Sequence, residues 1–248
     1  MIPSLLERYE REWADLQRKP IPASPDRPTN PLLLNVSPSY FEADCKVMIF
    51  GQETNDWEGP FPTEGGVDDL LMTYDSFYNT GYCYSRYGGA FWNGIGEFKR
   101  PLDELLRPSG RAIQIIWNNV IKIGKANEKN KPSAAILEWE DAWFDVVRFE
   151  VSTLKPDVIV FFCGWRYDPY INRIFPGASY ERVNQRRSAK ELARVKLAEF
   201  LPDGSTIRTY HPGYLWRVGF DEYLKETVAA IRLGRPDSDT CFDPCTIG

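Results

Sequence analysis

A short apolar run that passes directly into a polar turn is the feature that most constrains the fold of this chain. Residues 47–50 are all apolar, and Gly51 ends the run. A short run without polar alternation is typical of a strand that is buried on both faces of a parallel sheet. Four polar side chains follow within the turn: Gln52, Glu53, Asn55 and Asp56. Open α/β sheets bind ligands at the carboxyl ends of their strands, so we expect a site here. A merely solvated acidic turn is the alternative.

Further apolar runs occur at residues 113–117 and 158–163, and residues 206–210 are expected to form a fourth strand. Asn118 and Asn119 follow the first of these runs, and His211 follows the fourth strand. Apolar residues at helical spacing lie at 133–154, 185–200 and 220–233. Strands that alternate with helices predict a parallel sheet covered by helices on both faces. We therefore expect an α/β fold: a three-layer α/β/α sandwich with a central, mostly parallel, four-stranded sheet.

The remaining segments are expected to belong to the same single domain, residues 1–248, because a chain of this length suits one large domain. Residues 1–45 should form an amphipathic helix at 3–17 followed by an extended, proline-rich arm. Residues 57–90 are rich in Tyr and Gly and have the character of an insertion, with a short helix near 66–79. An acidic tail ends the chain at residues 236–248.

Composition excludes several classes of protein. No stretch approaches the roughly 18 consecutive apolar residues of a membrane span. The first residues lack the basic and then apolar pattern of a secretion leader. We therefore expect a cytoplasmic protein that does not enter a membrane.

The cysteines and the histidine do not form a metal motif. The five cysteines are scattered, and only Cys241 and Cys245 are close in sequence. The single histidine, His211, is distant from that pair. Zinc and iron–sulfur sites normally need two closely spaced pairs of ligands, and a disulfide framework needs an even, regular set. We expect no metal, no disulfide framework and no other cofactor.

The net charge of −5 argues against binding nucleic acid through a general positive field. A local basic face is nevertheless predicted at residues 184–196, where Arg186, Arg187 and Lys190 occur on the helix expected at 185–200. These three residues are candidates for contacts with DNA. The alternative is an ordinary solvated helix.

Four elements in a fixed order resemble the uracil-DNA glycosylase superfamily. The first is Gly-Gln-Glu-Thr-Asn-Asp at residues 51–56, in the place of a Gly-Gln-Asp-Pro-Tyr-His turn. The others are the pair Phe91 and Trp92, the Asn-Val-Ile step at residues 119–121, and His-Pro-Gly-Tyr-Leu at residues 211–215, in the place of His-Pro-Ser-Pro-Leu. The resemblance covers about residues 46–216. It implies a DNA glycosylase that leaves an abasic site.

The chemistry of that reaction suits two of these residues. Cleavage of an N-glycosidic bond passes through an oxocarbenium-like sugar, so a carboxylate is needed to stabilise the cation or to position water, and Glu53 would serve. The departing pyrimidine carries negative charge on O2, which His211 would stabilise as a fixed donor. The motifs contain no lysine that could attack the sugar, so we expect a monofunctional enzyme.

The resemblance also implies roles in binding. Asn119 would pair with the edge of a flipped base, and Phe91 would stack on its face, with Gln52 and Asn55 lining the pocket. Leu215 matches the apolar wedge that enters the base stack, and Gly213 replaces a serine that contacts phosphate. Ordinary core packing is the alternative for Phe91 and Leu215.

Departures from the family pattern predict an unusual substrate. Asn55 stands where the uracil-specific branch has a tyrosine that blocks carbon 5 of the base, and Glu53 replaces an aspartate. A pocket that is open at carbon 5 would admit a pyrimidine with a large substituent, such as the glucosylated hydroxymethylcytosine of phage DNA. The tyrosines of residues 57–90 would supply the additional walls.

Two other functions stay open at this point. The chain could be a glycosylase that excises uracil during repair, or a module that binds a base or a single strand of DNA without cleavage. A small-nucleotide enzyme is disfavoured because the glycine-rich phosphate loop is absent. In each of the first two cases we expect a monomer whose partner is DNA.

Overall fold

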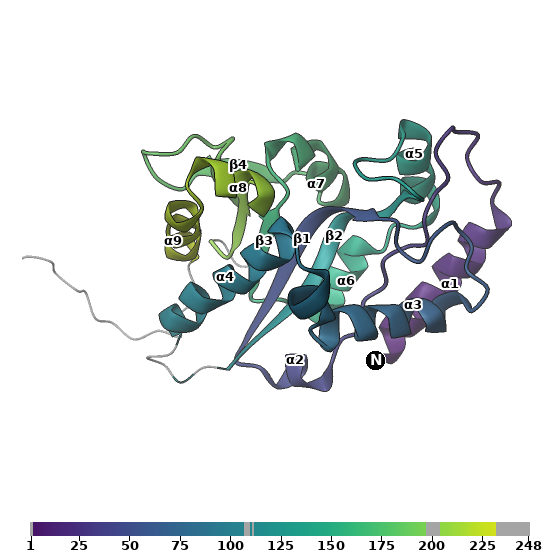
Figure 1. The fold of residues 1–248 in the computed structure, drawn as a ribbon, viewed down its shortest axis with the longest axis horizontal. Coiled ribbons are helices and arrows are strands. Elements are labelled where there is room, and N and C mark those ends of the chain that lie inside the picture. Colours follow the sequence, from purple (N-terminus) through teal and green to yellow (C-terminus); the bar gives the residue numbers. More distant parts are fainter. Residues whose placement is uncertain (1, 107–109, 111, 197–203, 232–248) are drawn as a thin grey trace, which may run out of the picture.

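The computed structural model describes residues 2–106, 110, 112–196 and 204–231 of the chain (Figure 1). Its centre is a six-stranded sheet with the order β2-β1-β3-β6-β5-β4. The strands are β1 (Cys45–Asn55), β2 (Ile113–Lys125), β3 (Val158–Phe162), β4 (Ser179–Arg182), β5 (Leu192–Lys196) and β6 (Thr206–Thr209). Strands β2, β1, β3 and β6 are parallel, and they are the four strands that the sequence predicts. The prediction of an α/β sandwich is confirmed, although the sheet has two further strands.

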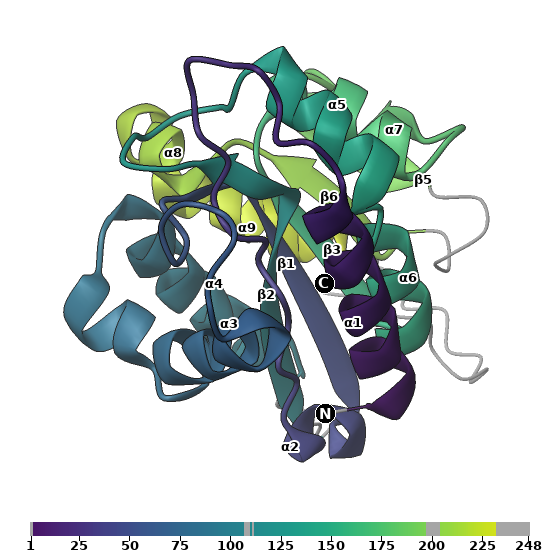
Figure 2. The same ribbon diagram turned by 90° about the vertical axis from the view of Figure 1, so that its right-hand side faces the viewer.

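Helices cover both faces of the sheet. Figure 2 shows α1, α6 and α7 on one side and α3 and α4 on the other. The helices are α1 (Pro3–Arg18), α2 (Pro38–Glu42), α3 (Gly66–Tyr74), α4 (Ala90–Leu106), α5 (Ala134–Trp143), α6 (Val147–Leu154), α7 (Asp168–Ile174), α8 (Pro212–Val218) and α9 (Phe220–Ala230). Two short π-helical segments, Asp75–Asn79 and Cys83–Tyr87, follow α3. The predicted tail at residues 236–248 lies outside the described residues.

The prediction of a basic helix at residues 185–200 is wrong over its described part. Residues 192–196 form strand β5, which is antiparallel to both β4 and β6. The spacing of Leu192 and Val195 is compatible with a helix, but both are buried residues of a strand that lies between β4 and β6. A short apolar run does not distinguish these two structures by its periodicity. Residues 197–200 lie outside the described residues.

The long helix predicted at residues 133–154 is two helices, α5 and α6. Phe144 separates them with φ −144° and ψ 45°, outside the helical region. Its side chain is buried in the core. The apolar spacing continues across the break, which is why the sequence predicts a single helix there.

Strand β2 is an edge strand whose backbone groups are bonded by side chains. The Tyr74 hydroxyl donates to the Trp117 carbonyl (2.8 Å) and accepts from the Trp117 N–H (3.2 Å). The Glu140 carboxylate accepts from the N–H groups of Lys122 (2.8 Å) and Ile123 (2.9 Å). These bonds occupy groups that would otherwise be available for pairing with another chain.

A buried polar network joins α1, β2 and α6. The Lys122 ammonium contacts the Glu150 carboxylate at 2.8 Å, and both side chains are 0% exposed. Asn118 accepts from Lys122 (2.7 Å) and donates to Glu150 (2.8 Å), while the Tyr9 hydroxyl donates to Glu150 (2.5 Å). Such a network is stable only when its donors and acceptors are paired, as they are here.

Two features are absent from the described residues. In that part of the chain, no helix is long and apolar enough to cross a membrane. The same residues contain no group of three or more His, Cys, Asp or Glu side chains that could hold a metal ion.

Candidate active site

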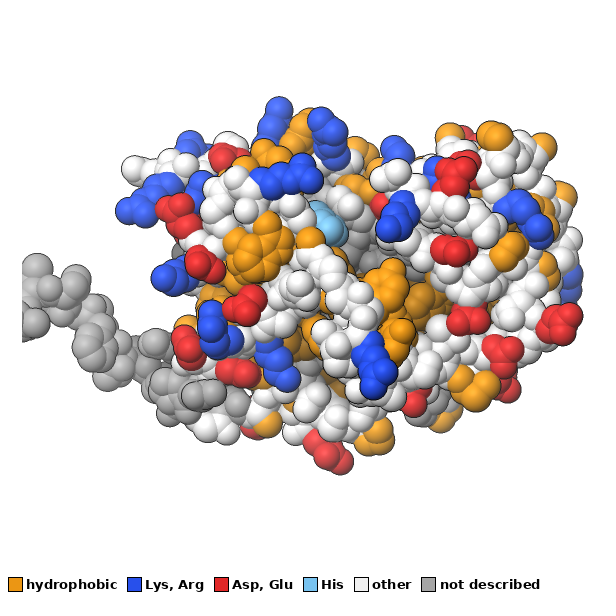
Figure 3. All heavy atoms as spheres, viewed as in Figure 1, with side chains coloured by type: hydrophobic (Ala, Val, Ile, Leu, Met, Phe, Trp, Pro, Cys, Tyr) orange, Lys and Arg blue, Asp and Glu red, His pale blue; other side chains and the backbone are white. Residues whose placement is uncertain are grey.

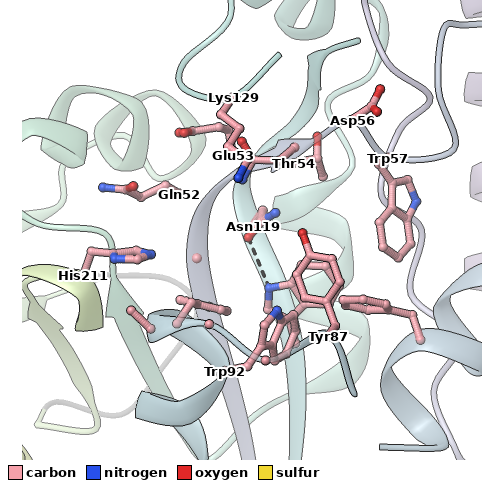
Figure 4. A pocket seen from close by; sticks show the side chains of 18 of the residues that line it. Gln52, Glu53, Thr54, Asp56, Trp57, Tyr87, Trp92, Asn119, Lys129 and His211 are labelled. Atoms are coloured by element: carbon pink, nitrogen blue, oxygen red, sulfur yellow. Dashed lines mark hydrogen bonds between the residues drawn. The ribbon is translucent and has the colours of Figure 1, made fainter. Parts of the chain in front are cut away.

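A cavity of about 560 Å³ opens beside the carboxyl-terminal part of β1 and the middle of β2 (Figure 4). It is where the sequence predicts a site, because Gly51 of β1 lies beside Asn119 of β2 in the parallel register. The structure brings six of the predicted residues into its lining: Gln52, Glu53, Asn55, Phe91, Asn119 and His211. They come from four separate stretches of the chain, so the fold assembles the site.

Glu53 is half-buried near the end of β1. Its carboxylate accepts a hydrogen bond from the hydroxyl of Tyr167, which lies in the turn after β3. Burial raises the pKa of the Glu53 carboxyl, opposed by the Tyr167 hydrogen bond and the positive charges of Lys131 and Lys125. A partly desolvated carboxylate has stronger electrostatic interactions than one in water, and is suited to stabilising a nearby cation.

His211 presents a defined donor to the cavity. It is the N-cap of α8, and its Nδ1 accepts from the N–H of Gly213 at 3.0 Å. In the neutral imidazole the proton is therefore on Nε2. The ring stacks on Phe91 with a centroid separation of 5.4 Å and an interplanar angle of 21°. Burial lowers the pKa of His211 to about 4, so the ring is neutral at physiological pH.

We expect the single histidine of the chain to titrate near pH 4 and not near 6.5. The pH dependence of its Hε1 resonance in NMR would give the value directly, because no other histidine contributes. The folded pKa is below the unfolded one, so its contribution to stability is complete above pH 6.5 and is lost as the pH falls toward 4. A His211→Gln variant identifies the signal, and a midpoint near 6.5 would contradict the buried, neutral ring.

Asn119 has a fixed amide. Its Oδ1 accepts from the indole N–H of Trp117 at 3.2 Å, the dashed line in Figure 4. Turning the amide over would break this bond, so Nδ2 keeps two donors and Oδ1 one remaining lone pair for a ligand. Gly51 makes this arrangement possible, since a Cβ there would lie 2.4 Å from Asn119 Oδ1.

The other two predicted base-binding residues, Gln52 and Asn55, lie in the last part of β1. Gln52 donates from Nε2 to the carbonyl of Cys163 at 2.9 Å, which ties the end of β1 to the end of β3. Asn55 is exposed at the last position of β1. Asp56 follows it and accepts from the N–H of Asn127 at 2.8 Å, so the two loops beside the cavity are joined.

Leu215 is not a surface wedge in this structure. Its side chain is 0% exposed and packs in the core. Helix α8 begins at Pro212, directly after His211. Because of this starting point, Leu215 lies on the side of the helix that faces the core. The neighbouring Tyr214 and Trp216 are the exposed residues, at 46% and 48%. Gly213, for which the resemblance implies a phosphate contact, supplies the N–H that fixes the His211 ring.

The three candidate DNA-binding cations have different surroundings. Arg187 forms ion pairs with Glu222 (2.9 Å) and Glu226 (3.0 Å) and lies over the Tyr223 ring at 3.9 Å. It is therefore occupied by side chains of α9, and this arrangement does not support its predicted contact with DNA. Arg186 and Lys190 have exposed side chains.

An aromatic wall forms the part of the cavity beyond the predicted residues. The lining includes Trp57, Phe77, Tyr82, Tyr87, Trp92 and Trp117. The richness of residues 57–90 in tyrosine indicated part of this wall. Tyr167 and Trp117 were missed as partners of Glu53 and Asn119, because side-chain contacts between separate strands leave no pattern in the sequence.

No protein-family model matches the chain, and no curated protein matches it at a significant level. The relationship to the uracil-DNA glycosylase superfamily therefore stays a hypothesis. The functional argument depends on the fold and on the geometry of the cavity.

Proposed function

We propose that this protein is a monofunctional DNA glycosylase that hydrolyses the N-glycosidic bond of a flipped-out pyrimidine and leaves an abasic site. The observation that carries the proposal is the placement of Glu53 and His211 around one cavity, each partly desolvated and each held by a hydrogen bond. In this proposal the protein is a monomer that acts on DNA in the cytoplasm and needs no metal or other cofactor.

Glu53 would act on the sugar. As the bond between C1′ and the base nitrogen breaks, the electron pair leaves with the base and positive charge develops on the sugar ring. A carboxylate beside the ring stabilises that charge and orients a water molecule for attack on C1′. The Glu53 carboxylate accepts the proton that the water loses as the new C1′–oxygen bond forms, and this proton then passes through solvent to the anionic base.

His211 would act on the leaving base. The departing pyrimidine gains negative charge, part of it on O2, and the Nε2–H group can donate to that oxygen. A neutral donor whose position is already fixed needs no reorganisation during the reaction, which is the advantage of a preorganised oxyanion site. The hydrogen bond from Gly213 and the stacking on Phe91 both hold the ring in place.

The size of the cavity favours a large base. Pockets of roughly 300–1,000 Å³ hold drug-sized ligands, and this cavity of about 560 Å³ falls in that range. An unmodified pyrimidine would fill only the part between Asn119 and Phe91. The aromatic wall and the hydroxyls of Tyr82 and Tyr87 line the remainder, which suits a polar substituent on carbon 5. We therefore propose a bulky 5-substituted cytosine, such as glucosylated hydroxymethylcytosine, as substrate.

Matched DNA substrates test this proposal. We expect the protein to release the base from DNA that contains glucosylated hydroxymethylcytosine at a rate at least tenfold higher than from DNA that contains uracil. Mass analysis identifies the released base, and alkali converts each abasic site into a strand break. Unmodified DNA of the same sequence is the control. Release of uracil alone would contradict the open pocket, and binding of DNA without release of any base would favour the non-catalytic module.

A further inference from the structure

Exposed aromatic rings and cations gather at the ends of β3 and β6, beside the cavity. Trp165 follows Gly164 at the end of β3 and is 37% exposed. The Lys190 ammonium lies 4.9 Å from the centroid of this indole, and the Arg166 guanidinium lies 5.7 Å from it. One aromatic ring is thus bordered by two positive charges on the surface.

A second exposed ring continues this surface toward the cavity. Tyr214 of α8 packs against Tyr210 with a centroid separation of 4.6 Å. Tyr210 also lies next to Gly164, where a Cβ would be 3.5 Å from its ring. Because Tyr210 directly precedes His211, the surface formed by Trp165, Lys190, Tyr210 and Tyr214 begins at the rim of the candidate site. We call it the Trp165–Tyr214 face.

A buried arginine beneath the Trp165–Tyr214 face holds its residues in place. Arg208 is 1% exposed, pairs with Asp168 of α7 (2.9 Å) and donates to the carbonyl of Lys190 (2.8 Å). It therefore fixes the loop that carries Lys190 against the start of α7, next to the short turn Trp165–Tyr167. The arrangement of the indole and the ammonium exists before any ligand binds.

The charge of the face is positive in an otherwise acidic protein. Among the described residues, neither Lys190 nor Arg166 takes part in an ion pair. The nearby carboxylates are engaged elsewhere, Asp168 by Arg208 and Glu191 by Ser188 (2.8 Å) and Tyr223 (3.0 Å). Figure 3 shows the histidine within a hollow and lysine and arginine side chains on the surrounding rim.

We propose that the Trp165–Tyr214 face binds unpaired nucleotides that flank the flipped base, so that the protein prefers a single strand or a locally opened duplex. The inference rests on the proposed function. Aromatic rings beside cations are the common means of holding single-stranded nucleic acid, because every base can stack and every phosphate can meet a positive charge. Tyr214 and Trp165 offer rings to bases on the strand, while Leu215, the expected wedge into a duplex, is buried.

Affinity for a single-stranded oligonucleotide tests the proposal. The oligonucleotide contains only unmodified bases, so the measurement by fluorescence anisotropy does not depend on catalysis. We expect Trp165→Ala and Tyr214→Ala each to raise the Kd by about tenfold, the effect of one lost stacked base. Lys190→Ala should reduce the slope of log Kd against log salt by about 0.7, the value for one phosphate contact on a single strand.

The chain offers a matched control on another surface. Trp143 at the end of α5 is 38% exposed, and the Lys19 ammonium lies 3.6 Å from its ring. Trp143→Ala and Lys19→Ala remove the same kinds of side chain and should leave the Kd unchanged. Trp165→Phe and Tyr214→Phe keep a ring and should retain most of the affinity, and thermal unfolding confirms that each variant is folded.

Several outcomes would overturn the inference. These are an unchanged Kd in Trp165→Ala and Tyr214→Ala, an equal loss in the Trp143→Ala control, or tighter binding of duplex than of single strand. Failure of the proposed function looks different, because the protein would then release no base although its aromatic-dependent binding persists. Release of base with no contribution from the face would reject only this inference.

Discussion

Glu53→Gln should lower the rate of base release by about 10³-fold, a typical effect of removing a group that acts on the transition state. Glutamine has nearly the same shape but carries no charge, so it cannot stabilise the oxocarbenium-like sugar. The affinity for DNA should change little, because the carboxylate acts on a charge that develops only as the bond breaks. Single-turnover rates with the best substrate and anisotropy with uncleaved DNA measure the two quantities separately.

The pH dependence gives a second test of the same residue. Catalysis needs the ionised carboxylate, and burial raises the pKa of Glu53 above 4.5. We therefore expect the rate to fall on the acid side at a pH above 4.5, and this limb should be absent from the residual rate of Glu53→Gln. The folded pKa is above the unfolded value, so stability falls as the pH rises through the folded pKa. The variant should accordingly be no less stable than the wild type at pH 7.

Glu58→Gln is the matched control. Glu58 also lines the cavity, but it is exposed and is placed on the loop beyond the end of β1. The same chemical change there should alter the rate by less than about threefold, since exposed charges are screened by solvent. Equal losses in the two variants would show that general charge matters, and would remove Glu53 from its proposed role.

The parallel part of the sheet was predictable because β1, β2 and β3 each contain a short apolar run, although β1 and β2 continue beyond these runs to Asn55 and Lys125. The antiparallel strands were not. Ser179–Arg182, which forms β4, has three exposed residues and no apolar pattern, so nothing in it indicates a strand. The burial of β5 depends on its neighbours on both sides, which local spacing does not reveal.

The candidate site also has a part that could be predicted from the sequence and a part that could not. Glu53, Asn119 and His211 could be placed together from sequence, because strand ends in a parallel sheet converge on one edge. The hydrogen bonds from Tyr167 to Glu53 and from Trp117 to Asn119 could not be predicted, because they depend on how the side chains pack in the folded protein. Leu215 shows the limit of matching a motif, since the motif does not define the phase of the helix on which its last residue lies.

Lys122→Met should reduce the free energy of unfolding by about 3–5 kcal/mol, the cost of leaving one partner of a buried ion pair uncompensated. The Glu150 carboxyl, at 0% exposure, would lose its only cationic partner in the network and keep only Asn118 and Tyr9 as hydrogen-bond donors. Urea unfolding with linear extrapolation measures the loss. The exposed pair of Arg18 and Asp15, whose side chains are 73% and 44% exposed at a separation of 2.9 Å, provides the control. Arg18→Met should cost less than about 1 kcal/mol.

A double variant separates charge from packing. In Lys122→Met with Glu150→Gln the buried charge is gone, and the new amide can still accept from Asn118 and donate to the Tyr9 hydroxyl. We expect it to recover at least half of the stability lost in Lys122→Met, which is a large non-additive coupling. If the double variant is less stable than the single one, the loss comes from the missing lysine side chain and not from the unpaired carboxylate.

The same buried network should affect the candidate site through Asn118, which contacts the backbone of Asn119. Asn118 Oδ1 accepts both from Lys122 and from the backbone N–H of Asn119, at 2.7 Å and 2.8 Å. Loss of the ammonium leaves the Asn118 amide less restrained, and the strand that presents Asn119 to the cavity loses part of its support. Lys122→Met should therefore slow base release at temperatures where it is fully folded, whereas Arg18→Met should not. Equal rates in these two variants, with the stability difference intact, would mean that the network supports the fold without positioning Asn119.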